Sequence, residues 1–270
     1  MRKIFLIACL FSIRGFGQEL YVFSEPASNM PARSLALKQS AKFLRNSTSG
    51  EGESRYTTEM MLGMNKNLML HASGSFSNMY SPSMRFESFR VYGKYRFLSN
   101  DELYRHFRMA FFVDGSYSRN NPVYDELSLE GDQSGVQAGI IATQLLHKLA
   151  ISATLNWTEI LQESRWEKVW PQSHPYQALG YSLSAGYLVL PKTYTDYNQT
   201  NLNLYVELLG QNTTDLKKYY VDLAPAAQLI FNSQAKLNIG YRFQLGSDMQ
   251  RMSPNSWLLS FEWLFLSVLK

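Results

Sequence analysis

From Ser34 onward, apolar and polar residues alternate with a period of two in segments of roughly ten residues. The clearest segment spans residues 149–158. Its first face carries Leu149, Ile151, Ala153, Leu155 and Trp157, and its second carries Ala150, Ser152, Thr154, Asn156 and Thr158. Successive side chains of a β-strand point to opposite faces, so each segment has one face suited to hydrocarbon and one suited to water.

The same pattern along the chain predicts about twelve strands, the number expected of a mid-sized membrane barrel. They lie near 34–44, 56–64, 68–77, 86–98, 105–118, 135–147, 149–160, 177–190, 200–211, 219–231, 235–246 and 256–269. A soluble β-sandwich with an aromatic core is the alternative, but soluble strands are usually shorter, about 5–6 residues.

The predicted connections alternate in length. Those after even-numbered strands are short, as at 65–67, 147–148 and 232–234. Those after odd-numbered strands are long and polar, as at 45–55, 119–134 and 161–176; the connection 191–199 is a long exception on the short side. Short periplasmic turns and long outer loops are typical of outer-membrane barrels. We therefore predict an all-β fold, a transmembrane antiparallel up-and-down β-barrel.

Residues 1–17 read as a cleavable signal peptide. Arg2 and Lys3 precede an apolar stretch at 4–13, and small residues follow at 15–17. The stretch is too short to cross a bilayer as a helix, which needs about 20 residues. The alternative is a lipoprotein signal with Cys9 acylated, but little apolar sequence precedes that cysteine.

Removing residues 1–17 changes what composition implies. The only cysteine is Cys9, so the remaining chain has no thiol to cross-link in an oxidising envelope. The segment holds three of the 26 basic residues and no acidic residue, which leaves 23 basic against 22 acidic residues. Nucleic acid is therefore not an expected partner, because binding it requires a basic footprint.

Residues 18–33 contain no alternating pattern. Pro26 and Pro31 oppose a helix and a central strand, so the segment is expected to be extended. It forms either a periplasmic tail or a segment folded back into the barrel mouth. The predicted organisation is a signal peptide at 1–17, an extended periplasmic segment at 18–33 and a transmembrane barrel at 34–270.

At this level the chain resembles bacterial outer-membrane β-barrels over residues 18–270. The aromatic face of the last strand, with Trp257, Phe261, Trp263 and Phe265, resembles the signal read by the barrel-assembly machinery, although the chain ends in Leu269-Lys270. The segment Glu25-Pro26-Ala27-Ser28-Asn29-Met30-Pro31-Ala32 looks like the N-terminal box of a family of uncharacterised outer-membrane proteins. That resemblance implies a loose link with metal handling.

The face assignment predicts which charged residues line the lumen and set its selectivity. They are Arg90, Lys94, Arg96, Arg108, Asp114, Glu207, Asp222 and Arg242. The basic residues of 86–98 and 105–118 would lie across the barrel from Asp222, and opposed charges across an aqueous constriction select among ions. Alternatively, the charges pair with one another and fill a closed interior; twelve strands permit both.

Two further motifs are candidate sites. The segment His71-Ala72-Ser73-Gly74 comes closest to the His-x-Ser-Asn-Gly motif of outer-membrane phospholipases, but it lacks the Asn and its polar residues face away from lipid. No catalytic residue, and hence no enzyme, is predicted. Met61 and His71 are candidate ligands for copper, because thioether and imidazole suit Cu(I). The alternative is that both simply line the interior.

The prediction is a porin-like, passive channel for small polar or charged solutes in the bacterial outer membrane, without a cofactor. Its expected partners are outer-membrane lipid, the barrel-assembly machinery and a small polar solute. The alternative function is a non-conducting barrel that docks a periplasmic or surface partner through residues 18–33, in copper handling.

Overall fold

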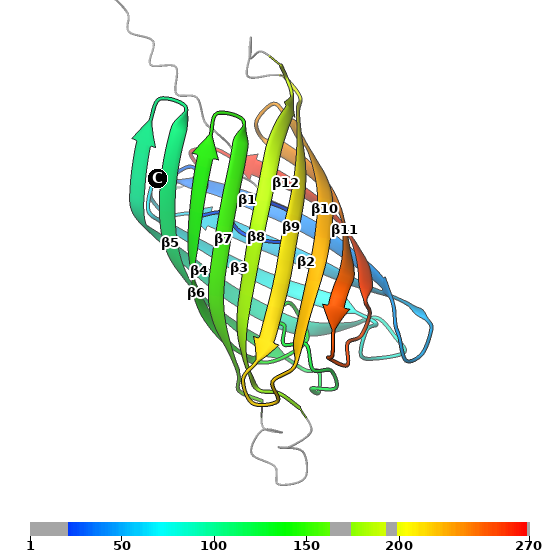
Figure 1. The fold of residues 1–270 in the computed structure, drawn as a ribbon. Helices are drawn as coiled ribbons and strands as arrows, with labels where there is room; N and C mark the ends of the chain where they lie inside the picture. Colours follow the sequence, from blue (N-terminus) through cyan, green and yellow to red (C-terminus); the bar gives the residue numbers. More distant parts are fainter. Residues whose placement is uncertain (1–20, 163–173, 193–198, 269–270) are drawn as a thin grey trace, which may run out of the picture.

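The computed structural model describes residues 21–162, 174–192 and 199–268, and it forms a closed antiparallel β-barrel (Figure 1). Each strand pairs with its sequence neighbours, and β1 pairs with β12 to close the sheet. The strands are β1 (Ser34–Arg45), β2 (Gly52–Gly63), β3 (Leu68–Ser77), β4 (Arg85–Glu102), β5 (Arg105–Ser118), β6 (Gly135–Leu146), β7 (Leu149–Ile160), β8 (Gln177–Leu190), β9 (Asn201–Thr213), β10 (Tyr219–Phe231), β11 (Ala235–Ser247) and β12 (Asn255–Phe265). The predicted fold class is confirmed.

The two faces of the sheet follow the alternation in the sequence. On β7, the side chains of Leu155 and Trp157 are exposed on the outside, while Ser152 and Thr158 are buried inside. The same division gives every strand an outer apolar residue, as seen in Phe43, Met60, Phe76, Val91, Val113, Ile140, Leu155, Leu183, Val206, Phe231, Ile239 and Trp263. This outer belt is the surface expected against hydrocarbon.

The barrel has two unlike ends. The turn end carries the short connections 103–104, 147–148 and 232–234, together with the start of β1 and the end of β12. The loop end carries the connections 46–51, 78–84, 119–134, 214–218 and 248–254. The turn end is the upper end in Figure 1. By the usual topology of such barrels, the turn end faces the periplasm.

Three strand ends differ from the sequence-based prediction by four residues each, and the others differ by two residues or fewer. β2 begins at Gly52, because β1 offers it partners as far as Arg45. β4 continues to Glu102, because it stays paired with β5 beyond the turn-end rim. β12 stops at Phe265, not 269, because its partner Leu35 lies next to the start of β1 and no strand continues past it.

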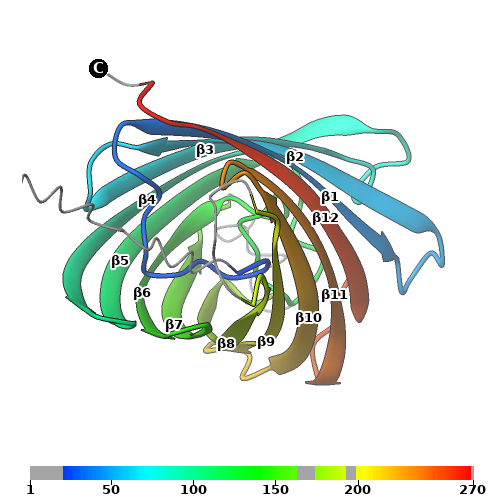
Figure 2. The same cartoon turned by 90° about the horizontal axis from the view of Figure 1, so that it is seen from above.

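Two irregular segments fold into the barrel. Residues 21–30, called here the inserted segment, enter from the turn end and cross the interior (blue in Figure 2). Residues 119–134, the inserted loop, enter from the loop end. The described residues include no helix long and apolar enough to cross a membrane.

Candidate functional site: the occupied lumen

The inserted segment is anchored on one side by Glu207 of β9, whose side chain is fully buried. The backbone amides of Val22 and Phe23 both donate to its Oε1 at 2.9 Å, and the hydroxyl of Ser24 donates to its Oε2 at 2.6 Å. The Ser184 hydroxyl donates to the same Oε2 at 3.2 Å. With three hydrogen bonds from the segment and one from Ser184, the Glu207 carboxyl group anchors the segment to β9.

Lys94 of β4 anchors the segment on the opposite side of the lumen. Its buried ammonium donates to the carbonyl oxygens of Pro26 and Ser28 at 2.7 and 2.9 Å, and it pairs with the carboxylate of Glu25 at 3.2 Å. Burial raises the pKa of Glu25, but Lys94, His71 and Lys38 together lower it by more, so its pKa lies below the ordinary 4.5. Arg108 adds a bond to the Ser28 hydroxyl at 2.8 Å. These contacts place residues 21–30 inside the barrel rather than in a free tail.

Apolar residues on the inward faces form a seat for the segment. Ala27 is fully buried in a cluster with Tyr92, Phe112 and Ile141. Ile140 and Ile141 blur the alternation of β6 in the sequence, and the structure gives the reason: Ile140 faces outward while Ile141 packs inside. Large apolar residues on the water-facing side of a barrel strand are therefore a sequence signal for an inserted segment.

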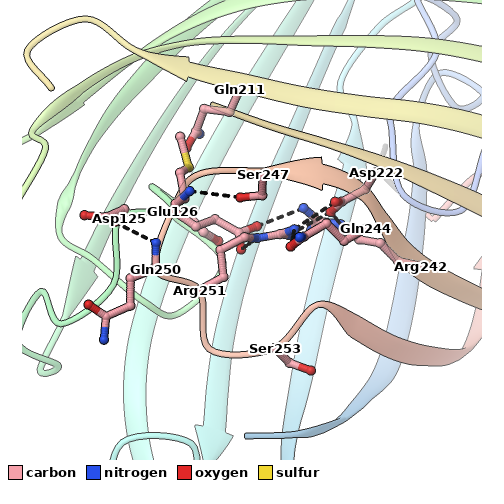
Figure 3. Close-up of polar contacts among 12 residues, drawn as sticks. Asp125, Glu126, Gln211, Asp222, Arg242, Gln244, Ser247, Gln250, Arg251 and Ser253 are labelled. Atoms are coloured by element: carbon pink, nitrogen blue, oxygen red, sulfur yellow. Dashed lines mark hydrogen bonds and ion pairs between the residues drawn. The ribbon is translucent and has the colours of Figure 1, made fainter. Parts of the chain in front are cut away.

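The inserted loop is held by a network of ion pairs near the loop end (Figure 3). Glu126 accepts from Arg242 and Arg251 at 2.9 and 2.8 Å. Asp222 on β10 pairs with the same two arginines. Burial raises the pKa of Glu126, but Arg242 and Arg251 lower it by more, so it lies well below the ordinary 4.5. The backbone of Leu127 exchanges two further hydrogen bonds with Gln211, at 2.9 and 2.8 Å.

A third arginine, Arg55, joins the inserted loop to the barrel wall at β2 and β4. Arg55 of β2 is buried and pairs with Glu87 at 2.6 Å and with Asp132 of the loop at 2.7 Å. Gly131 lies against this pair with a φ of +115°, a conformation that favours glycine. A Cβ at this position would come within 2.3 Å of Glu87 Oε1.

All eight residues proposed for selectivity lie on inward faces, but salt bridges and hydrogen bonds engage them. Arg90 pairs with Asp114 at 2.7 Å, and Arg242 pairs with Asp222. Lys94, Arg108 and Glu207 hold the inserted segment, and Arg96 donates to the Lys66 carbonyl oxygen at 2.6 Å. Asp222 is paired with Arg242 and Arg251, which agrees with the alternative that the lumen charges pair with one another. Selectivity set by these eight residues stays a prediction.

Glu126, Arg251 and Arg55 were not among the predicted site residues. The first two lie in loops, where alternation carries no information about which way a side chain points. Leu127 and Leu129 were the sequence signal that this loop folds inward, because leucine side chains are most often buried. Both are buried, in a cluster with Ile160 and Tyr176.

Met61 and His71 lie opposite each other on β2 and β3 and both face inward. Their side chains have different neighbours. Met61 packs with Ala36, Leu264 and Met30, whereas His71 Nδ1 lies 2.8 Å from Glu59 Oε1 and its ring lies against Tyr92. Copper binding by this pair stays a prediction.

A cavity of about 330 Å³ lies between the two insertions. Residues 21–25 bound it on one side and residues 126–130 on the other. Its charged wall comes from strands β1 to β5 and its uncharged wall from β6 to β9. The lining includes Lys38, Lys42, Glu59 and Arg90 on the charged side, and Thr154, Asn156, Tyr181 and Gln211 on the uncharged side. The lumen thus contains a largely polar chamber bounded by the inserted segment and the inserted loop.

The barrel as a whole is similar to solved bacterial channels. An outer-membrane channel from Pseudomonas putida F1 matches with a TM-score of 0.61 at 11% identity, over 91% of this chain and 100% of that one. The NanC porin matches with a TM-score of 0.51 at 11% identity, over 85% of this chain and 98% of that one. No family model and no curated protein matches the sequence. These likenesses show the fold: a closed β-barrel of the kind found in outer-membrane channels, here with an apolar outer belt.

Proposed function

We propose that this barrel is a passive channel for small polar solutes, closed in the present state by the inserted segment. The observation that carries the proposal is the polar chamber inside a closed membrane barrel, bounded by insertions that polar contacts hold. Water or a polar solute can take over such contacts when the segment leaves, because water-mediated hydrogen bonds are nearly as favourable as direct ones.

The selectivity of this channel differs from the simple basic lumen expected from the sequence. Arg90 and Asp114 neutralise each other, as do Lys38 and Glu59, whose Nζ and Oε2 atoms lie 3.7 Å apart. A chamber with balanced charges favours uncharged or zwitterionic solutes over ions of one sign, because neither sign gains a net attraction. We therefore expect weak ion selectivity.

A disulfide lock tests whether the inserted segment closes the channel. The hydroxyl oxygens of Ser24 and Ser184 lie 2.9 Å apart, so a Ser24→Cys/Ser184→Cys chain can join the segment to β8. We expect discrete conductance steps in planar bilayers for the reduced protein and their loss on oxidation. A matched control is Gln39→Cys/Thr58→Cys on the outer face, where the two residues are direct cross-strand partners on β1 and β2.

The outcomes separate the alternatives. Conductance that oxidation leaves unchanged in the Ser24/Ser184 variant refutes the segment as the closing element. Absence of conductance in all reduced proteins refutes the channel and favours a non-conducting barrel. Docking of a partner through residues 18–33 has little structural support, because backbone groups from Val22 to Ser28 are already bonded to the barrel wall.

A further inference from the structure

The barrel wall holds the inserted segment through main-chain groups as well as through side chains. Glu207 Oε1 accepts two successive amides, Thr143 Oγ1 accepts the amide of Ala27 at 2.9 Å, and Lys94 Nζ donates to two carbonyl oxygens. Any peptide carries such amides and carbonyls, and the bend at residues 22–24 turns two successive amides toward the same oxygen. The wall therefore recognises a bent peptide backbone, and bonds to the side chains of Ser24, Glu25 and Ser28 add to this recognition.

Two shallow sites add a preference for aromatic side chains. The ring of Phe23 lies directly over Gly240 of β11, where a Cβ would come within 2.5 Å of a ring carbon. The ring of Tyr21 contacts Tyr205 edge-on, with centroids 5.6 Å apart. Glycine at 240 thus leaves the space that the aromatic ring fills.

The buried charges of this wall need partners in every state. Glu207 and Lys94 are both fully buried, and a buried charge without a partner is strongly unfavourable. When the segment leaves, water or a solute with the same donors and acceptors has to replace it. A peptide offers those groups at the same spacing.

From these contacts we propose that the lumen wall formed by Lys94, Thr143, Glu207 and Gly240 is a peptide-binding groove, and that short peptides able to adopt this bent backbone are the solutes of the channel. The inserted segment then acts as an internal competitor that occupies the groove. This rests on the proposed channel function for the passage of peptide, but binding to the groove is measurable without conductance.

The test uses full-length protein in which the competitor is weakened and the groove is intact. Val22→Pro removes one amide donor, and Phe23→Ala removes the ring over Gly240, so the double variant frees the groove. The probe is a fluorescent synthetic peptide with the sequence of residues 21–28. We expect it to bind the double variant at least tenfold more tightly than the unsubstituted protein.

The control peptide has the same sequence but is N-methylated at the residues equivalent to Val22 and Phe23. It keeps the side chains and lacks the two amide donors, so we expect binding at least tenfold weaker. Adding Glu207→Ala to the double variant should weaken the unmethylated peptide and abolish the difference between the two peptides. Adding Gly240→Val should weaken both.

Equal binding of the two peptides, or binding that Glu207→Ala leaves unchanged, overturns the groove. Conductance steps that the peptide does not block would also refute peptides as the solute, while the channel itself would stand. Peptide binding in a protein that never conducts would leave the groove intact and refute the channel.

Discussion

Replacing Glu207 with alanine is the most direct perturbation of the closed state. The carboxylate accepts three hydrogen bonds from the inserted segment, two from amides and one from a hydroxyl. A hydrogen bond to a charged group contributes about 1.5–3 kcal/mol, so three bonds have an upper range of about 4.5–9 kcal/mol. Such bonds are not additive, and water that enters the lumen re-satisfies the amides, so we take about 3 kcal/mol for the whole anchor.

A change of about 3 kcal/mol corresponds to a shift of about 140-fold in the ratio of open to closed channels, since 1.4 kcal/mol is tenfold. The assay is the open probability from single-channel recordings at fixed voltage and salt. Thr154→Ala is the matched control, because Thr154 lines the chamber on the uncharged wall opposite the charged strands. An open probability that changes less than threefold in Glu207→Ala would show that the segment is not held closed by this carboxylate.

Three further predictions concern the inserted loop and the barrel that carries it. Arg55→Ala leaves Glu87 and Asp132 without their cation and should destabilise the folded barrel by about 3–5 kcal/mol, measured as a lower urea midpoint of unfolding in detergent. Because the pKa of Glu126 is lowered in the folded protein, its stabilising contribution is present above pH 4.5 and is lost as the pH falls through the folded pKa. The hydrogen-exchange protection factor of the Leu127 amide should therefore be the same at pH 7 and pH 5. In Glu126→Gln that protection factor should be smaller at both values, and a protection factor as high as in the unsubstituted protein would contradict the ion-pair account.

The barrel was largely predictable from sequence because its signal is local. Lys94 and Glu207 could be assigned to the inner face from their neighbours alone, because the side-chain period of a strand is two. In the structure, Ile140 of β6 is exposed on the outside and Ile141 is buried inside, as this period requires.

What occupies the lumen could not be predicted in this way. The bonds from Val22 to Glu207 and from Leu127 to Gln211 join residues far apart in sequence, and irregular segments have no period from which a direction can be read. Lys94 illustrates the limit. Its inward position was predictable from the alternation. Its role as an anchor depends on Pro26 and Ser28, whose positions the alternation does not give. Cleavage after residue 17 and recognition of the last strand by the barrel-assembly machinery stay predictions.

The anchors of the inserted segment lie on β4, β6, β9 and β11, which together reach around most of the circumference. The surface that receives residues 21–30 therefore needs the curved wall from β4 to β11 to be in place. Although this stretch precedes every strand in the chain, we expect it to dock after that wall has formed. Assembly would then pass through a barrel with an empty lumen, and protection of residues 21–30 would mark its last step.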